Sequence, residues 1–460
     1  MATPAVHEIA RHWLRSMWQS LRGQDAVLAE VHFSGSGDLP SVYAVSDLAA
    51  AAVGCAGAAV AELLATRFGA LPAVAVNRRL ASLWFGVSLQ PLGWTLPSPW
   101  DPIAGDYACV DGWIRLHTNA PHHRAAALGV LGAAATREAV SHAVQSWRCD
   151  ELETAVVERG GCAATMRSEQ AWQAHPQGQA VNAEPLMAWQ SAAPLAGWNW
   201  QPQRERPLQG LRILDLTRVL AGPVATRLLA GFGADVLRID PPEWDEPAVV
   251  ADVSLGKRCA RLNLRDAVDR ATFEQLLRRA DVLVHGYRSD ALERLGFDAA
   301  TRRAWQPGLV DVSLDAYGWS GTWRGRRGFD SLVQMSTGIA ATGMQQLRKD
   351  RPTPLPVQAL DHATGYLLAA AVIRGITQRL RDGCGCEART SLARVAQLLT
   401  SGPRCLPGEF AAATIADWME EIEPTAYGSA HRLRPPLHVE RAVLRWVRPA
   451  SRLGSASPSW

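Results

Sequence analysis

The alternation of short apolar runs with helical patterns between residues 211 and 314 constrains the fold more than any other part of the chain. Residues 211–216 and 234–240 each have the pattern of a short buried strand, and the helix predicted between them ends at Gly231. A strand, a helix and a strand at this spacing form a right-handed parallel unit. Two further strands, each preceded by a helical pattern, are predicted at residues 280–285 and 309–314. The sequence therefore predicts an α/β fold with a doubly wound, Rossmann-like parallel sheet, whose ligands bind at the carboxyl ends of the strands.

The turn after the first predicted strand lacks the glycine pattern of dinucleotide-binding proteins. That pattern is Gly-x-Gly-x-x-Gly, in which glycines let the backbone approach a pyrophosphate. Here residues 217–223 contain only Gly222, and the pair Gly231 and Gly233 lies at the far end of the helix. We therefore expect no NAD cofactor.

Two long helical segments look like versions of one element, because each begins with an aspartate. Asp47 precedes an Ala-rich run that reaches Arg67, and Asp361 precedes an Ala/Leu/Ile run that reaches Arg381. Each continues, at a similar offset, into a second apolar segment, at residues 76–84 and 390–398. An aspartate in this position is most often a helix cap, whose carboxylate accepts a hydrogen bond from the first turn. A catalytic carboxylate is the alternative interpretation.

A chain of 460 residues is long for one hydrophobic core and favours two or three domains. The segment 190–209 is rich in Trp, Gln and Pro without apolar periodicity, and we interpret it as a linker. Before it, residues 1–189 contain a hairpin with an Asp111-Gly112 turn followed by helices, which predicts a small α+β domain at about 87–180. The α/β domain is predicted at 210–400 and a C-terminal return segment at 401–460.

Charge and cysteine content exclude several classes of function. The net charge of +3 is spread along the chain, so no basic patch predicts a nucleic-acid partner. No secretory signal and no charge-free run long enough to span a membrane is present, so we expect a cytoplasmic protein without a membrane partner. The eight cysteines are dispersed; Cys384 and Cys386 form the one close pair, without a second pair or nearby histidines. Reduced thiols and no metal site are expected.

Several blocks of the α/β region resemble one enzyme family. Residues 214–223 and 233–240 are similar to the opening of the class III CoA-transferases, the carnitine-dehydratase/bile-acid-inducible (CaiB/BaiF) family. Blocks at 256–264, 284–297 and 316–321 follow the same family in the same order, so that the resemblance covers about 208–400. The first region resembles the second half of the family through the Asp47 helix, the hairpin 107–116 and the loop 175–177. The resemblance thus implies a family member with its halves in permuted order.

The resemblance implies specific site residues. The catalytic carboxylate corresponds to Asp361, with Pro356 before it and Gly365 one turn after it, whereas Asp47 has Ala51 at the matching glycine and is interpreted as a cap. Asp330 is a candidate supporting acid, with a role in a buried turn as the alternative. The positions that resemble CoA contacts of the family are Val219, Ala221, Leu262, Tyr287, Arg294 and Arg327. For Arg294, a solvated helix face is an equally good interpretation.

The chemistry implied is the transfer of CoA from an acyl-CoA thioester to a free carboxylic acid. An aspartate, ionised at neutral pH in its ordinary state, can attack the thioester and store the acyl group or CoA covalently. Such a step needs backbone N–H donors for the oxyanion and exclusion of water. The resemblance also implies a homodimer, interlocked in the family, or an intramolecular equivalent.

Two other functions stay open at this point. The same superfamily contains α-methylacyl-CoA racemases, which move a proton with a histidine; that histidine would fall at Phe329, and a phenyl ring cannot exchange a proton. The second alternative is a catalytically degenerate CoA-binding or scaffold subunit, in which order and site residues have diverged.

Overall fold

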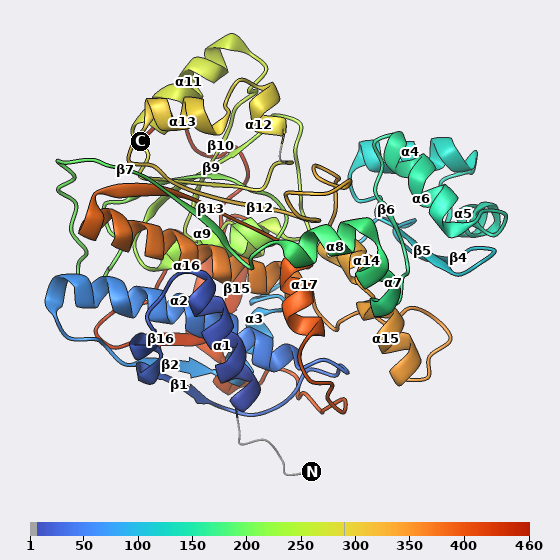
Figure 1. Cartoon of the computed structure of the whole chain (residues 1–460), viewed down its shortest axis with the longest axis horizontal. Helices are drawn as coiled ribbons and strands as arrows, with labels where there is room; N and C mark the ends of the chain where they lie inside the picture. The colour runs from blue at the N-terminus through green and yellow to red at the C-terminus, as the bar shows by residue number, and fades with distance from the viewer. Residues whose placement is uncertain (1–6, 289) are drawn as a thin grey trace.

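The large sheet of the protein has seven strands, in a computed structural model that describes residues 7–288 and 290–460 (Figure 1). Its spatial order is β10 (Arg258–Arg261), β9 (Asp235–Asp240), β8 (Arg212–Leu216), β11 (Val282–His285), β12 (Val310–Asp315), β13 (Cys384–Ser391) and β7 (Ala188–Pro194). All neighbours are parallel except β13 and β7. From β8 the chain adds β9 and β10 on one side, and it then crosses to the other side of β8 to form β11, β12 and β13. The topological switch point of the sheet therefore lies between β8 and β11. This doubly wound sheet confirms the predicted fold class.

Both faces of the sheet are buried because consecutive strand residues alternate between two hydrophobic cores. Ile213 and Val236 belong to one core, whereas Leu214 and Leu237 belong to the other. The first core is covered by α9 (Ala221–Gly231) and α16 (Ala359–Asp382), and the second by α11 (Ala267–Arg278) and α13 (Ala299–Trp305). Apolar runs of branched residues therefore form strands here, as a parallel sheet with two covered faces requires.

The N-terminal region adds a second layer to the first core. Helix α2 (Val45–Phe68) packs along α16, and α1 (Glu8–Ser20) packs on α2. Helices α2 and α16 run in the same direction, because Glu62, late in α2, pairs with Arg374 and Arg381, late in α16. Helix α2 has the length and apolar composition of a membrane span, but it is buried inside the protein and serves as a core helix. A small sheet lies beside it, in the order β1 (Val31–Ser34), β2 (Val74–Asn77) and β16 (Leu437–Val439).

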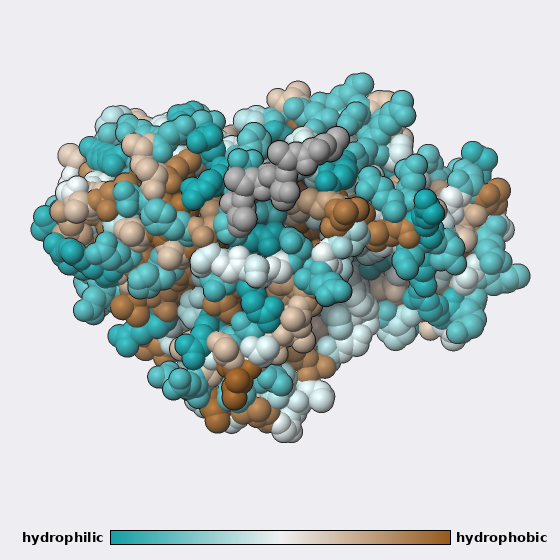
Figure 2. Space-filling view, turned by 90° about the horizontal axis from the view of Figure 1, so that it is seen from below, coloured by the Kyte–Doolittle hydropathy of each residue, from teal (hydrophilic) through white to brown (hydrophobic). Residues whose placement is uncertain are grey.

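A smaller domain projects from the main body (Figures 1 and 2). It contains β4 (Gly105–Ala108), β5 (Trp113–Leu116), β6 (Ala163–Thr165), α4 (Pro121–Leu131), α5 (Arg137–Val144) and α6 (Cys149–Glu158), around a core of its own. Helices α7 (Glu169–Ala174) and α8 (Pro176–Ala183) lead back to β7. Helices α14 (Asp330–Ser336) and α15 (Ile339–Gln346) connect the sheet to α16, and α14 contacts β5 and β6. The small domain thus lies against the segment that precedes the Asp361 helix.

The remaining elements complete the main body. Short helices follow the sheet strands at α10 (Val250–Val253) and α12 (Ala291–Arg294), and α17 (Leu392–Thr400) follows β13. A third small sheet joins distant parts of the chain in the order β14 (Trp418–Thr425), β15 (Gly428–Leu433) and β3 (Leu89–Pro91). Helix α3 (Arg78–Trp84) follows β2, and two 3₁₀ helices lie at Asp25–Glu30 and Ile415–Asp417. On the face drawn in Figure 2, apolar side chains form small groups among hydrophilic ones.

The two similar helices have nearly the same local geometry. Both span 24 residues, and the residues before them have φ −76° with ψ 60° for Ala44 and 64° for Gln358. Each helix is followed by a strand whose last residue caps a short helix: Asn77 accepts a hydrogen bond from the N–H of Leu80, and Ser391 accepts one from that of Arg394. The repeated letters therefore correspond to a repeated helix, strand and helix.

Two sequence interpretations are corrected here. Asp47 is not the cap of α2, because it lies inside the first turn and its carboxylate accepts hydrogen bonds from Arg78, with a distance of 2.8 Å from Nη2 to Oδ2. The predicted linker at 190–209 begins too early, because its first residues are part of β7 and pair with β13. An edge strand that pairs on one side only needs no apolar periodicity, and for this reason the pattern of a strand was missing.

Candidate active site

The site is organised around the first turn of α16. Asp361 is buried, with 8% of its surface exposed, and its backbone N–H donates a hydrogen bond to Asp330 Oδ2 at 2.9 Å. Asp330 is the first residue of α14 and also accepts a hydrogen bond from the Gln334 amide. The structure therefore brings the two candidate acids together, one supporting the helix turn that carries the other.

Gly365 sets how closely this turn approaches the sheet. A Cβ at this position would lie 2.5 Å from the backbone oxygen of Ala221 and 2.8 Å from Cβ of Val224. Only a glycine lets α16 pack this tightly on the first turn of α9. Asp361, one helical turn before Gly365, is thus held near the carboxyl end of β8.

The ionisation of both acids is opposed by their surroundings. Burial raises the pKa of Asp330 to about 6. Burial, followed by the negative charge of Asp330, holds the pKa of Asp361 well above its ordinary value. Burial and a second nearby acid both disfavour the charged form of a carboxyl group, so Asp361 is harder to ionise than an ordinary aspartate.

The turn between β8 and α9 has a strained backbone. Val219 has a φ of 64°, in the left-handed region that a β-branched residue rarely adopts. Its N–H donates to Glu246 Oε2 at 2.9 Å, and Glu246 in turn accepts a hydrogen bond from Arg238 at 2.6 Å. These two hydrogen bonds help to hold the turn in its strained conformation.

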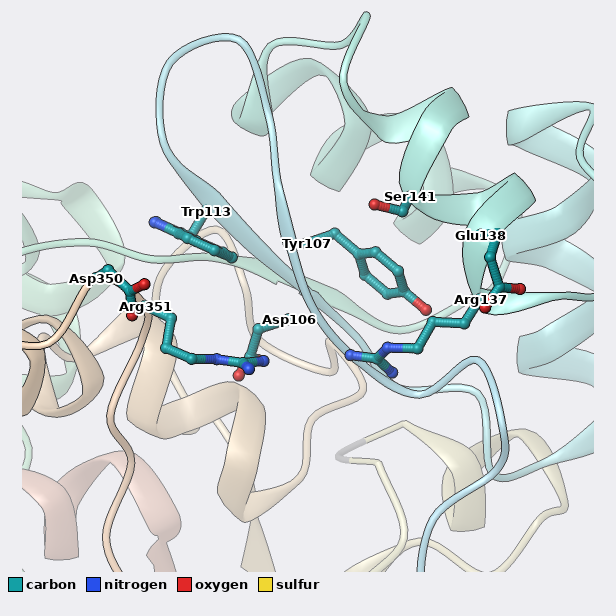
Figure 3. Close-up of a pocket in the computed structure, with 8 residues that line it drawn as sticks. All are labelled: Asp106, Tyr107, Trp113, Arg137, Glu138, Ser141, Asp350 and Arg351. Carbon is teal, nitrogen blue, oxygen red and sulfur yellow. The ribbon is translucent and has the colours of Figure 1, made fainter.

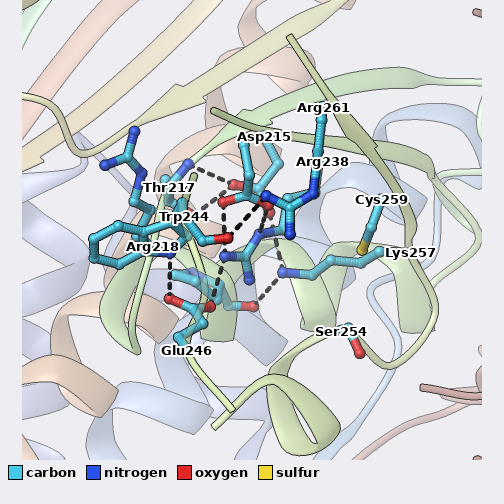
Figure 4. Close-up of polar contacts among 12 residues, drawn as sticks. Asp215, Thr217, Arg218, Arg238, Trp244, Glu246, Ser254, Lys257, Cys259 and Arg261 are labelled. Atoms are coloured by element: carbon cyan, nitrogen blue, oxygen red, sulfur yellow. Dashed lines mark hydrogen bonds and ion pairs between the residues drawn. The ribbon is translucent and has the colours of Figure 1, made fainter. Parts of the chain in front are cut away.

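A buried network of charges lies under this turn (Figure 4). Asp215, at the end of β8, accepts hydrogen bonds from Thr217, Thr226 and Lys257, with Nζ of Lys257 at 3.0 Å. Lys257 has no exposed surface on its side chain and also donates to the Pro223 carbonyl. The Lys-Arg block that carried part of the family resemblance thus supports the turn from below.

Four of the predicted CoA contacts are uncharged residues. Val219 and Ala221 form the strained turn, while Leu262 is buried in the second core beside β9. Tyr287 follows β11; its hydroxyl accepts a hydrogen bond from Arg218 at 3.1 Å, and the Arg218 guanidinium lies 5.1 Å from the centre of its ring. Arg218, which the sequence did not single out, therefore lies between the turn and Tyr287.

The two predicted phosphate cations are engaged within the protein. Arg294 pairs with Asp290 at 2.5 Å, although 69% of its side chain is exposed. Arg327 donates to the carbonyl of Gly160, in the small domain, at 2.9 Å. A cleft of about 410 Å³ separates α6 from this region; it is lined by Thr154, Val157, Glu158, Arg288, Asp290, Arg294 and residues 322–326. Arg294 thus faces a cleft, while Arg327 joins the α/β and small domains.

The small domain supplies side chains that sequence reasoning missed. The ring of His117 stacks on that of Phe329, with centroids 3.7 Å apart, and His123 contacts the same ring edge-on at 5.9 Å. Both imidazoles thus contact Phe329, the residue that directly precedes Asp330. No local pattern marks them, since they follow β5 and begin α4, some 200 residues before Phe329.

A second cleft, of about 440 Å³, lies on the other side of the small domain. Figure 3 shows Trp113, Asp106 and Arg351 on one flank and Tyr107, Arg137, Glu138 and Ser141 on the other. Its lining, completed by Asp350, includes none of the predicted site residues. We therefore place the candidate active site at Asp361 and not in this cleft.

Comparison with known proteins identifies the segment that carries this site. Residues 208–416 match the family model described as CoA-transferase family III, which confirms the resemblance for that segment. The succinate–glutarate CoA-transferase of Agrobacterium fabrum is 31% identical over 204 residues, covering 40% of this chain and 50% of the relative. The succinyl-CoA:glutarate CoA-transferase of Mus musculus is 30% identical over 250 residues, covering 50% and 55%. The chain spans about half the length of the curated relatives it matches.

Among solved structures, Rv3272 from Mycobacterium tuberculosis is similar over part of the chain. The alignment has 29% identity and a TM-score of 0.40, and it covers 43% of this chain and 57% of the other.

Proposed function

We propose that this protein is a CoA-transferase that moves CoA between an acyl-CoA thioester and a free carboxylic acid, with Asp361 as the nucleophile. The observation that carries the proposal is the position of Asp361: it lies buried at the start of α16, packed through Gly365 on the strained β8–α9 turn. This arrangement lies within the segment that matches CoA-transferase family III.

The proposed reaction needs no group outside the protein and its substrates. A carboxylate oxygen of Asp361 attacks the thioester carbonyl, the C–S bond breaks, and CoA leaves as a thiolate. The acyl group then remains on Asp361 as a mixed anhydride. The thiolate then attacks the aspartyl carbonyl, which releases the first acid and leaves an aspartyl-CoA thioester. The second acid repeats these steps in reverse and leaves as its CoA thioester, which restores the carboxylate. Burial of Asp361 excludes the water that would hydrolyse the anhydride.

The position of CoA follows from the groups around the turn. The first turn of α9 has no side-chain cap among the described residues, and it directs the positive end of the helix dipole at the carboxyl end of the sheet. Tyr287 and Arg218 offer an aromatic face and a cation beside it. The cleft between α6 and the residues Arg288, Asp290 and Arg294 has four arginines against two carboxylates, which suits a phosphate-bearing nucleotide. We place the thioester at Asp361 and the nucleotide toward this cleft.

Only the ionised form of Asp361 is a nucleophile. Burial and the charge of Asp330 raise the pKa of Asp361 and so disfavour that form. Exchange of CoA should therefore become faster as pH rises through the range in which the pair ionises. The phenyl ring of Phe329 cannot act as a base toward an α-proton, so we do not propose racemisation.

The test is exchange of label between a ¹³C-labelled acid and its unlabelled acyl-CoA, with the acids of the relatives, succinate and glutarate, as first probes. Replacement Asp361→Ala should abolish exchange. Hydroxylamine added during turnover should attack the aspartyl carbonyl, displace the acid or CoA, and leave a hydroxamate on Asp361 of the wild type. Asp47→Asn, at the same position of the twin helix, is the matched control and should retain exchange. Exchange by folded Asp361→Ala would refute the assignment. CoA binding without exchange or trapping would identify a CoA-binding scaffold.

We further propose that the active unit is either a homodimer or a single chain whose two regions complete one site. The Gly160–Arg327 contact between the small domain and the segment before α14 supports the second form. Sedimentation of the active protein distinguishes the two.

A further inference from the structure

Two buried imidazoles from the small domain flank the residue that precedes Asp330. His117, which follows β5, stacks on Phe329 with an interplanar angle of 10°, and His123, in the first turn of α4, meets the same ring at 72°. Asp330 in turn contacts the first turn of α16, which carries Asp361. The small domain therefore packs two imidazoles on Phe329, the residue next to Asp330 in the chain.

Three of the four ring nitrogens lack a hydrogen-bond partner within residues 7–288 and 290–460. His117 is 6% exposed and His123 is 4% exposed. Nδ1 of His117 and both ring nitrogens of His123 have no hydrogen-bond partner among the described residues. Buried polar atoms are nearly always paired in proteins, because an unpaired one loses its hydration without compensation. Two such groups at one aromatic ring indicate a place where a ligand supplies the missing partners.

The ionisation of these groups decides what they can do. Burial lowers the pKa of both His117 and His123 to about 3, and the nearby charges of Arg115 and Arg327 act in the same direction. A neutral imidazole offers one N–H donor and one acceptor nitrogen. A base with so low a pKa would transfer protons poorly at neutral pH, so hydrogen bonding and not proton abstraction is the role that remains.

We propose that His117 and His123 bind a hydroxyl group of the carboxylic acid that receives CoA, so that the enzyme selects hydroxy acids over their unsubstituted counterparts. The inference rests on the proposed function. A hydroxyl donates one hydrogen bond and accepts others, which matches a pair of neutral imidazoles. The strained turn and Tyr287 are left for CoA.

The first test compares CoA acceptors in pairs, with acetyl-CoA as donor. In the wild type, kcat/KM should be higher for lactate than for propionate, or for 3-hydroxybutyrate than for butyrate, by about 10-fold or more, because a site built for a polar group rejects the analogue that lacks it. His117→Phe and His123→Phe should remove this preference without changing KM for acetyl-CoA. His117→Asn keeps an N–H donor and should retain part of the preference. His142→Phe, on the exposed face of α5, is the matched control.

A second measurement does not depend on turnover. Ring ¹⁵N signals of histidine-labelled protein, assigned with the two phenylalanine variants, should shift for His117 and His123 when lactate or 3-hydroxybutyrate is added. They should not shift with propionate or butyrate. Equal kcat/KM within both acid pairs would overturn the inference. So would ring ¹⁵N signals of His117 and His123 that do not shift with either hydroxy acid. If the wild type transfers CoA to no acid at all, the proposed function fails, and the ¹⁵N shifts still decide whether a hydroxyl binds here.

Discussion

Replacement of Gly365 by alanine should separate activity from stability. The added Cβ would lie 2.5 Å from the backbone oxygen of Ala221, and a backbone atom cannot rotate away as a side chain can. The first turn of α16 must then move away from the first turn of α9 by a fraction of an ångström to about 1 Å. Asp361 moves with it, relative to the turn that positions the thioester.

The expected magnitudes follow from two opposing terms. Overpacking a buried contact costs about 1–3 kcal/mol. Alanine in place of glycine inside a helix returns about 1 kcal/mol. The net loss in free energy of unfolding should therefore be about 0–2 kcal/mol, a shift in Tm of a few degrees for a chain of this size. A displacement of about 1 Å between reacting groups, by contrast, can lower the rate about 100-fold.

Gly375 provides the matched control on the same helix. A Cβ there would lie 2.6 Å from Cγ1 of Val310 and 2.7 Å from Sγ of Cys386, so its steric conflict is similar but lies about 10 residues from Gly365. Gly375→Ala should also lower Tm, though by no more than Gly365→Ala because the side chains of Val310 and Cys386 can shift, and it should leave kcat near that of the wild type. The assays are thermal unfolding followed by circular dichroism and exchange of labelled acid. Equal loss of kcat in both variants, or none in Gly365→Ala, would refute the link between this contact and catalysis.

Three further outcomes are expected. A raised carboxyl pKa stabilises the folded state at low pH, and this contribution is lost as pH rises through the folded pKa. For Asp330 the window runs from its ordinary value of 3.8 to about 6, and the pKa of Asp361 is raised in the same direction, so wild-type Tm should fall across this window and Asp361→Asn should flatten that fall. Glu246→Ala removes the acceptor of the Val219 N–H and should raise KM for acyl-CoA in a kinetic titration, with a loss of about 3–5 kcal/mol in urea unfolding because a buried ion pair is broken. Glu62→Ala removes the carboxylate that pairs with Arg374 and Arg381 of α16, and it should lower the free energy of unfolding by a similar amount, about 3–5 kcal/mol. KM should not change, and a changed KM would contradict the assignment of this ion pair to the core.

Local sequence patterns were sufficient to predict four parallel strands of the large sheet. The runs that became β8, β9, β11 and β12 are short, branched and apolar, as strands buried on both faces must be. Asp361 could be proposed from sequence because its motif, with Pro356 and Gly365, is local. Its role as a nucleophile remains a prediction.

Long-range contacts could not be derived in this way. The cap proposed for Asp47 failed because Arg78, 31 residues further on, offers the carboxylate a stronger partner. The same applies to the contacts around Phe329, because His117 and His123 come from a separate domain. The raised pKa of Asp361 also depends on Asp330, which only the folded chain brings near.

The position of β16 has a consequence for synthesis. This strand, from Leu437 to Val439, pairs with β2, which is made more than 350 residues earlier, and Leu437 also packs on Gly57 of α2. During translation the apolar surface of α2 therefore stays incompletely covered until nearly all of this sequence has left the ribosome. A nascent chain with such a long wait is exposed to aggregation, so its yield should depend on chaperones more than that of a chain whose sheets close locally.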